Sequence, residues 1–358
     1  MLKFLHSTAA ALLAAMLPIS AALAFEKPVL LADQGSFLAG GNVKQETGNF
    51  DFQNPANPQG QTLHGDHAYV FYQKPVKAHK YPLVFLHGAG QSAKTWETTP
   101  DGRDGFQNIF LSRGYSTYLV DQPRRGKAGN STIPEKITAT ALDQLWFSNF
   151  RFGSWPNFFP GVQVSQNKQS LEQFFRQMTP NTGAFDEQLI SDAMAEVFAK
   201  TGKGVLITHS QGGGPGWWTA IKSENVKAVV AFEPGSGFVF PEGEVPPALE
   251  TSSPFGPLKG TPITLENFNR LTKIPIIIYY GDYIPLEPTT EWNKDNWRVR
   301  LIMARQWAEA VNRHGGNAVV VHLPEIGIKG NTHFLFADLN NVEIANHMEK
   351  WLITNKLR

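Results

Sequence analysis

One stretch of this chain, VLITHSQGGGPGWW at Val205–Trp218, constrains the fold more than any other. An apolar, β-branched run ends at Thr208, and a helical pattern begins only after a run of glycines. This order predicts a strand, a tight turn and a helix. Ser210 stands at the apex of the turn, where a serine projects beyond the carboxyl end of its strand while its backbone is strained. The stretch therefore predicts one unit of a parallel sheet with a polar group at the sheet edge.

The rest of the chain repeats this alternation of strand and helix. Apolar runs without polar alternation are typical of parallel strands that are covered on both faces. Strands that alternate with amphipathic stretches imply right-handed crossovers, so we predict an α/β fold with a mostly parallel central sheet and helices on both faces. Val29–Gln73 has no helical pattern and should supply antiparallel strands at one edge. The expected strands are Ala68–Gln73, Leu83–Leu86, Ser116–Val120, Gly204–Thr208, Ala228–Phe232, Pro275–Tyr280 and Ala318–Leu323, and the expected helices are Gly105–Ser112, Asp186–Lys200, Gly216–Ser223, Arg298–His314 and Val342–Asn355.

Composition narrows the class of protein. The chain has 358 residues, with 32 basic residues against 31 acidic ones and no cysteine. A chain of this length can bury a large core within one α/β domain. The near-zero net charge gives no reason to expect nucleic acid or an anionic membrane surface as a partner. The lack of cysteine excludes disulfides, a thiol nucleophile, lipoprotein acylation and a cysteine-ligated metal.

The first residues predict export. Lys3 precedes the apolar run Ala9–Leu17, Pro18 breaks that run, and Ala22–Ala24 provides an A-x-A cleavage site. These are the parts of a secretory signal peptide, whose apolar region is too short to span a bilayer permanently. A buried N-terminal helix is the alternative. We expect residues 1–24 to be removed and residues 25–358 to form a single domain, soluble and located in the periplasm or outside the cell.

Two segments interrupt the alternation of strands and helices. Asn130–Thr182 is rich in aromatic residues, and Gly235–Leu271 is rich in proline and glycine. Long insertions in a compact α/β domain tend to be functional. We interpret both segments as caps or pocket walls. The alternative is an additional layer that shields the sheet, because clustered aromatic side chains serve either purpose.

Ser210 is the candidate nucleophile. In the usual G-x-S-x-G pattern, the residues two before and two after the serine are small because strand and helix approach closely there. Gly212 satisfies this on one side. Thr208 replaces the first glycine, with a side chain short enough to be accommodated. The order of strand, H-S-Q-G-G and helix favours a catalytic serine over a serine in an ordinary glycine-rich turn.

A catalytic serine needs a histidine base that is held in one tautomer. His333 lies in GIKGNTHFLF, between the last expected strand and the last expected helix, and therefore in a loop at the carboxyl edge of the sheet. A histidine in this place, after the serine and an acid, is the order found in α/β-hydrolases. His209 is expected to pack behind the turn. The other histidines considered are assigned to the signal peptide, an exposed turn, a strand and the last helix: His6, His314, His322 and His347.

Two carboxylates are candidates for the acid that orients the histidine. Glu233 ends the strand in VVAFEPG, and Asp282 ends the next one in IIIYYGDY. Either would lie at the correct edge of the sheet to orient an imidazole and stabilise its charged form. Position alone leaves the choice open, although an aspartate after the later strand is the commoner arrangement.

An oxyanion-binding loop is expected in LVFLHGAGQS, where His87 and Gly88 end a strand and open a run of small residues. The backbone N–H groups of Ala89 and Gln211 should face the oxyanion of a tetrahedral intermediate. His87 is expected to anchor the loop rather than to react. No H-x-H, H-E-x-x-H or comparable ligand cluster occurs, so neither a metal nor another cofactor is expected.

Taken together, these segments resemble a known family. HGAGQSAKTWETTPDGRDGF, RGYSTYLVDQPRRG, THSQGG, FEPG and GNTHF are similar to segments of exported bacterial α/β-hydrolase esterases, over a span from about Tyr69 to the C-terminus. The loop TWETTPDGR, Thr95–Arg103, is the most specific part of the resemblance. In that family the acid is a glutamate at the end of the strand after the nucleophile, which implies Glu233 here. Asp282 becomes the second choice, a neighbour of the histidine loop.

The resemblance implies hydrolysis of a small-molecule carboxylic ester through an acyl-enzyme on Ser210. The chain departs most from the family in its two insertions, so the substrate itself is not implied. Candidates for substrate binding are Arg103, Trp146 and Trp155. Two roles are open for Arg103 and Arg124: they recognise an acidic group on the substrate, or they form ion pairs that stabilise loops. The rival functions are amide or lactone cleavage on the same residues and a catalytically inactive hydrolase fold used for binding.

Overall fold

A computed structural model describes residues 28–358 and is built around an eight-stranded sheet. Six neighbouring strands of this sheet pair in parallel, and the remaining two lie at one edge in antiparallel pairing. The predicted parallel sheet with antiparallel strands at one edge is therefore confirmed. The signal peptide predicted at residues 1–24 lies outside the described residues. In spatial order the strands are β1 (Leu31–Ala39), β4 (Ala68–Pro75), β6 (Thr117–Asp121), β5 (Leu83–Leu86), β9 (Gly204–His209), β10 (Val226–Phe232), β13 (Pro275–Tyr280) and β14 (Asn317–His322).

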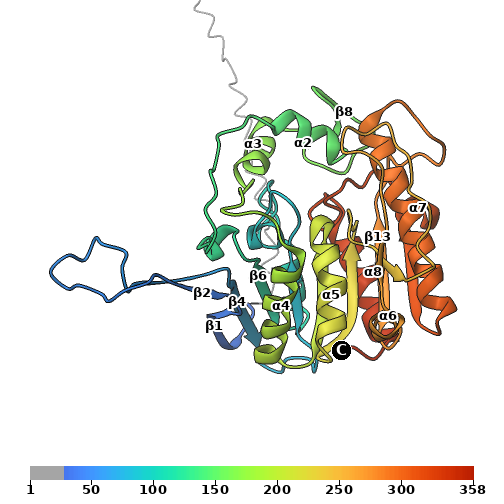
Figure 1. The fold of residues 1–358 in the computed structure, drawn as a ribbon. Helices are drawn as coiled ribbons and strands as arrows, with labels where there is room; N and C mark the ends of the chain where they lie inside the picture. Colours follow the sequence, from blue (N-terminus) through green and yellow to red (C-terminus); the bar gives the residue numbers. More distant parts are fainter. Residues whose placement is uncertain (1–27) are drawn as a thin grey trace, which may run out of the picture.

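Helices cover both faces of the sheet, as predicted (Figure 1). Because successive side chains of a strand point to opposite faces, a wholly buried strand such as β9 contributes to two separate cores. Leu206 belongs to the core shared with α4, α5 and α7, whereas Val205 and Ile207 belong to the core shared with α1 and α8. These helices are α1 (Phe106–Ser112), α4 (Glu187–Thr201), α5 (Gly213–Lys222), α7 (Trp292–Arg313) and α8 (Asn341–Thr354).

The aromatic insertion, Asn130–Thr182, lies beyond the carboxyl ends of the central strands (Figure 1). It contains α2 (Asp143–Asn149), the short antiparallel pair β7 (Gly153–Ser154) and β8 (Asn157–Phe158), and α3 (Lys168–Arg176). Its buried phenylalanines belong to the same core as Phe334, which follows His333 in the last loop of the sheet. They are Phe147, Phe150, Phe152 and Phe174.

The proline-rich insertion, Gly235–Leu271, packs on the other side of the sheet. It forms the parallel pair β11 (Val239–Pro241) and β12 (Thr261–Ile263), followed by α6 (Leu265–Leu271). Phe238 and Phe240 join the core that contains α5 and α7. The indole N–H of Trp307 in α7 donates to the carbonyl of Val239 (2.8 Å). Most of this insertion is therefore a layer over two helices.

Shorter elements complete the structure. An antiparallel hairpin of β2 (Asn42–Gln45) and β3 (Thr62–Gly65) projects from the body (Figure 1). Single 3₁₀ turns are η1 (Ala93–Trp96), η2 (Gly126–Ala128), η3 (Ser210–Gly212) and η4 (Leu323–Ile326). Within residues 28–358 no helix combines the length and the apolar character needed to cross a membrane.

Candidate active site

Ser210 follows β9 directly and begins the turn that leads into α5. Its φ is +53°, a left-handed conformation that costs energy for a residue with a side chain. A Cβ atom at Gly212 would lie 2.6 Å from the carbonyl oxygen of His87, so a glycine is needed there. A Cβ at Gly216 would lie 2.6 Å from Cγ2 of Thr208. The threonine that replaces the first glycine of the pattern is thus accommodated because the helix carries a glycine opposite it.

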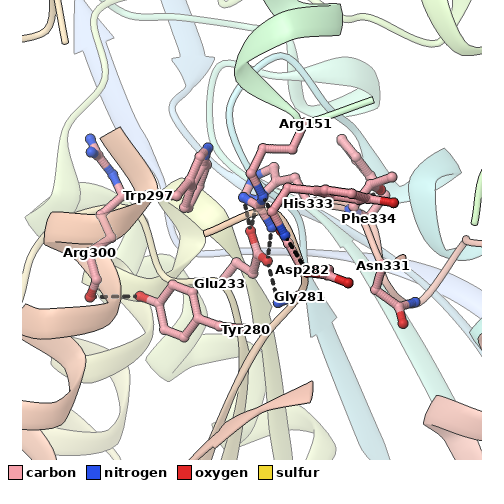
Figure 2. Close-up of polar contacts among 12 residues, drawn as sticks. Arg151, Glu233, Tyr280, Gly281, Asp282, Trp297, Arg300, Asn331, His333 and Phe334 are labelled. Atoms are coloured by element: carbon pink, nitrogen blue, oxygen red, sulfur yellow. Dashed lines mark hydrogen bonds and ion pairs between the residues drawn. The ribbon is translucent and has the colours of Figure 1, made fainter. Parts of the chain in front are cut away.

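The structure brings Ser210, Glu233 and His333 to one edge of the sheet. Phe232 of β10 is in register with His209 of β9, so Glu233 and Ser210 leave neighbouring strands side by side. Glu233 Oε2 lies 2.6 Å from His333 Nδ1, and both side chains are fully buried (Figure 2). His333 Nε2 is buried without a hydrogen-bond partner in the described part of the chain. One ring nitrogen is therefore held by a carboxylate while the other is free to exchange a proton.

Arg151, from the aromatic insertion, is the main partner of Glu233 that sequence reasoning missed. Its Nη1 donates to Glu233 Oε2 (2.9 Å) and its Nη2 donates to Oε1, which also accepts from the N–H of Gly281 (2.6 Å) (Figure 2). The Arg151 Nε donates to the carbonyl of Asp282 (2.8 Å), and its guanidinium lies over the ring of Trp297. The one available signal was an arginine between phenylalanines, because a cation in a buried segment needs an anionic partner.

The charges around the histidine decide its protonation. Burial would raise the pKa of Glu233, but Arg151 and His333 outweigh it and lower that pKa to about 2. Burial is the largest cause that lowers the pKa of His333 to about 4; Glu233 raises this pKa, whereas Arg151 and Arg300 lower it. His333 is therefore neutral at pH 7, which is the state a proton acceptor requires.

Asp282, the second choice for the acid, supports the loop and does not bind the imidazole. Its carboxylate accepts from the N–H of Tyr283 (2.6 Å) and from that of Gly330 (2.7 Å). Its own N–H donates to the carbonyl of Asn331 (2.8 Å). These bonds fix the segment that immediately precedes His333.

The expected oxyanion loop lies directly against the serine. A Cβ at Gly88 would lie 2.7 Å from Cβ of Ser210. The N–H of Ala89 has no acceptor within residues 28–358, and the N–H of Gln211 lies in the first helical turn, where intrahelical acceptors are lacking. Ala89 and Gln211 also line a cavity of about 710 Å³, together with Trp146 of the aromatic insertion.

Two other histidines near the turn have structural contacts. The buried His87 accepts a hydrogen bond from the N–H of Gln122 through Nε2 (3.3 Å) and contacts the carbonyl of Gly88 through Nδ1 (3.0 Å). His209 lies behind the turn, with Nε2 at 3.1 Å from the carbonyl oxygen of His333. These positions agree with the expectations that His87 anchors the loop and that His209 packs behind the turn.

Arg103 and Arg124 form ion pairs within loops. Arg103 pairs with Asp101 (2.7 Å) and donates to Asn341 Oδ1 (2.9 Å), which joins the TWETTPDGR loop to α8. Arg124 pairs with the buried Asp66 (2.7 Å). Both guanidinium groups therefore form ion pairs between loop residues, which is the alternative to recognition of an acidic group on the substrate.

The two tryptophan candidates lie in different surroundings. Trp146 is stacked on Phe150 and lines the cavity beside Ala89. Trp155 is exposed, packs edge-to-face on Phe147, and is not among the residues that line this cavity. In residues 28–358 there is also no cluster of three or more side chains suited to hold a metal ion.

Comparison with known proteins finds relatives that match over most of the chain. The profile of the Alpha/beta hydrolase family matches residues 83–338. The chain is 27% identical over 310 residues to the "Probable secreted lipase phiG" of Fungal sp. (strain ATCC 74256), a match that covers 76% of this chain and 81% of that protein. It is also similar to the structure of a novel bacterial esterase solved at atomic resolution. That likeness has a TM-score of 0.73 and 28% identity, and it covers 92% of this chain and 98% of the esterase.

Proposed function

This chain belongs to the alpha/beta hydrolase family, and we propose that it is an exported serine esterase that hydrolyses carboxylic esters through an acyl-enzyme on Ser210. The observation that carries the proposal is the 2.6 Å contact between Glu233 and His333 beside a serine on a strained turn, with the other histidine nitrogen free. Similarity to a bacterial esterase and to a probable secreted lipase supports an ester as the substrate.

In the proposed mechanism, Ser210 Oγ attacks the ester carbonyl carbon while His333 Nε2 accepts the hydroxyl proton. Glu233 holds the N–H at Nδ1 and stabilises the imidazolium that forms. The N–H groups of Ala89 and Gln211 stabilise the oxyanion, each by roughly 3–4 kcal/mol. His333 then protonates the departing alcohol, and the acyl group remains on Ser210. Water attacks this acyl-enzyme while His333 takes its proton, and the carboxylic acid leaves as the proton returns to Ser210.

Ser210→Ala tests the nucleophile. We expect the variant to fold and to lose hydrolysis of short acyl esters, and a fluorophosphonate probe should label the wild-type protein but not the variant. Hydrolysis that survives in Ser210→Ala would overturn the assignment. A wild-type protein that resists the probe and cleaves no ester would favour the inactive, binding protein, whereas cleavage of amides or lactones over esters would favour the other acyl hydrolases.

A pair of variants tests the acid. Glu233→Gln removes the carboxylate that holds the imidazole and should lower kcat by about 10⁴-fold. Asp282→Asn changes a side chain that binds only backbone N–H groups and should cost far less. The assignment of Glu233 fails if Asp282→Asn proves the more damaging change.

We also propose that residues 25–358 act as one domain and that the segment before them directs export. The support for one domain is that side chains of both insertions lie in the cores on the two faces of the sheet. The export proposal rests on the N-terminal pattern and on the description of the relative as secreted. N-terminal sequencing of protein recovered outside the cytoplasm should begin at Phe25, and a chain that starts at Met1 would contradict cleavage.

A further inference from the structure

Arg300, in α7, presents an unused guanidinium edge near the candidate nucleophile. Its Nη1 donates to the carbonyl oxygen of Asn296 (2.6 Å) and to Asn296 Oδ1 (2.5 Å). The guanidinium also lies over the ring of Trp297 (Figure 2). Nε and Nη2 have no hydrogen-bond acceptor within the described residues. These two nitrogens form the edge that binds a carboxylate through two parallel hydrogen bonds.

The four arginines that are buried within residues 28–358 are all paired or fully hydrogen-bonded. Arg124, Arg151 and Arg298 each form an ion pair with an acidic side chain. Arg125 has no such pair, but every one of its guanidinium nitrogens donates to an oxygen. Arg300 forms no ion pair with any residue between 28 and 358, and its exposure is only partial. A cation held largely out of water gains much from an anionic partner.

Burial lowers the pKa of Arg300 to about 10, so the group remains cationic at neutral pH. The Asn296 bonds and the Trp297 ring also restrict its side chain. A guanidinium that is already oriented loses little freedom when it binds a ligand. The free edge is therefore suited to bind an anion.

Gly235 lies between Ser210 and Arg300. A Cβ atom at Gly235 would lie 3.6 Å from Ser210 Oγ and 3.9 Å from Arg300 Nε, and no other residue would be nearer. Gly235 is not among the glycines with positive φ, so its backbone conformation does not by itself require glycine. Residue 235 therefore places no side chain between the serine hydroxyl and the guanidinium.

We propose that Arg300 binds a carboxylate carried by the ester substrate a few bonds from the scissile carbonyl. The proposal rests on the esterase function and adds a substrate class to it. The carboxylate can belong to the acyl part, as in a monoester of a short dicarboxylic acid, or to the alcohol part, as in an ester of a hydroxy acid. In both cases its two oxygens accept from Nε and Nη2 while the ester carbonyl lies at Ser210.

Matched substrates test this site. Methyl hydrogen succinate and 3-acetoxypropanoate carry the carboxylate on the acyl and alcohol sides, and methyl succinamate and 3-acetoxypropanamide are their neutral counterparts of similar shape. We expect kcat/KM of the wild-type enzyme to favour the carboxylate in at least one pair by about tenfold or more, because hydrogen bonds to charged groups are the stronger ones. The pair that shows the preference identifies the side that binds near Arg300.

Arg300→Met should reduce that ratio to about one, mainly through a higher KM for the carboxylate ester. Arg300→Lys should give an intermediate ratio, because lysine keeps the charge but not the two-pronged edge. The matched control is Arg305→Met, which removes an arginine of the same helix that pairs with Glu325 at the surface (2.6 Å) and should leave the ratio unchanged. A ratio that stays the same in both Arg300 variants, or a wild-type enzyme that prefers the amides, overturns the proposal.

Binding without turnover separates this proposal from the esterase function. Succinate should raise the melting temperature of Ser210→Ala and should not raise that of Ser210→Ala combined with Arg300→Lys or Arg300→Met to the same extent. If succinate binds in this manner while the wild-type protein cleaves no ester, the esterase function fails and the anion site stands. If esters are cleaved but succinate gives the same shift with and without Arg300, the anion site fails and the esterase function stands.

Discussion

The two insertions of this protein look alike as interruptions of an α/β pattern, yet they contribute differently to the candidate site. The aromatic insertion, Asn130–Thr182, brings Arg151 onto Glu233 and stacks Phe150 on the ring of His333 (centroids 5.1 Å apart). The proline-rich insertion, Gly235–Leu271, buries Phe238 and Phe240 against α5 and α7. Its first residue, Gly235, lies beside Ser210.

The difference teaches that an insertion acts on chemistry through charge and contact, and that its length says little. Arg151 holds both oxygens of the glutamate, so the aromatic insertion sets where the proposed catalytic acid points and how it is charged. The proline-rich insertion acts through apolar burial, which supports the helix after the serine. Changes in the aromatic insertion should therefore alter kinetics, and changes in the part of the proline-rich insertion beyond Gly235 should alter stability alone.

Among changes within the two insertions, the largest effect is expected for Arg151→Met. It leaves Glu233 as a buried anion that has lost two hydrogen bonds, so we expect a loss of about 3–5 kcal/mol in the free energy of unfolding. Because the carboxylate is then free to turn away from His333, kcat should also fall by about 10²-fold or more. Denaturant unfolding and steady-state kinetics measure the two effects.

A double variant separates these two effects. Arg151→Met combined with Glu233→Gln removes both charges, so it should recover part of the stability lost in Arg151→Met while remaining almost inactive. Near-normal kcat in folded Arg151→Met would show that Arg151 does not position Glu233.

Phe240→Ala tests the role of the proline-rich insertion. Phe240 is almost fully buried in the proline-rich insertion, and its truncation should lower the free energy of unfolding by about 3–5 kcal/mol. Activity per folded molecule should match that of the wild type, measured at a temperature where the variant remains folded. A large drop in kcat at full folding would mean that the two insertions are not separable in this way.

A smaller effect is expected in the pH dependence. His333 must be neutral to accept a proton, and its pKa is lowered to about 4, so kcat/KM of the wild type should fall only as the pH drops toward 4. Arg151→Met removes a cation that lowers this pKa and keeps the anion that raises it. The acid limb should then move toward neutral pH by about one unit. A limb that moves to lower pH, or not at all, would contradict the role given to Arg151.

Stability should respond to acid in the same direction. An unfolded histidine takes up a proton below about pH 6.5, whereas His333 in the folded protein does so only near 4, so the free energy of unfolding decreases as the pH falls through this window. Glu233 adds a stabilising contribution that is complete above about 4.5 and is lost as the pH falls toward 2. Unfolding curves between pH 3 and 7 would reveal both trends.

Much of the fold follows from local pattern, because the central parallel strands consist mainly of apolar residues. Pro275–Tyr280 and Leu83–Leu86 have the bounds that the sequence predicts. The start of α7 was predicted wrongly, at Arg298 instead of Trp292. Its first turns are polar in sequence but buried, because Asn296 and Trp297 bind Asn149 of α2. A hydrophobic period cannot reveal a helix face that is buried through hydrogen bonds.

The candidate site likewise contains some residues that a local sequence pattern reveals and others that it does not. Ser210 and His333 are recognisable because each follows a strand in a distinctive local segment. Glu233 and Asp282 both follow parallel strands at one edge, so position alone did not separate them, and the structure places only Glu233 on the imidazole. Arg151 reaches Glu233 across 82 residues of sequence from a segment without a regular period. Long-range ion pairs of this kind leave no local pattern to read.

The smallest effect is expected for Trp146→Ala, a change within the aromatic insertion. Trp146 lines the cavity beside Ala89 and is only partly buried, so Trp146→Ala should enlarge the cavity with little loss of stability. We expect KM for short acyl esters to rise by about three- to tenfold, since a partly buried aromatic contact contributes on the order of 1 kcal/mol. Bulkier acyl groups should be affected less, because they occupy the vacated space. The matched control is Trp155→Ala, an exposed tryptophan of the same insertion that does not line the cavity. Equal effects of the two substitutions across a series of acyl chain lengths would mean that the cavity is not where the substrate binds.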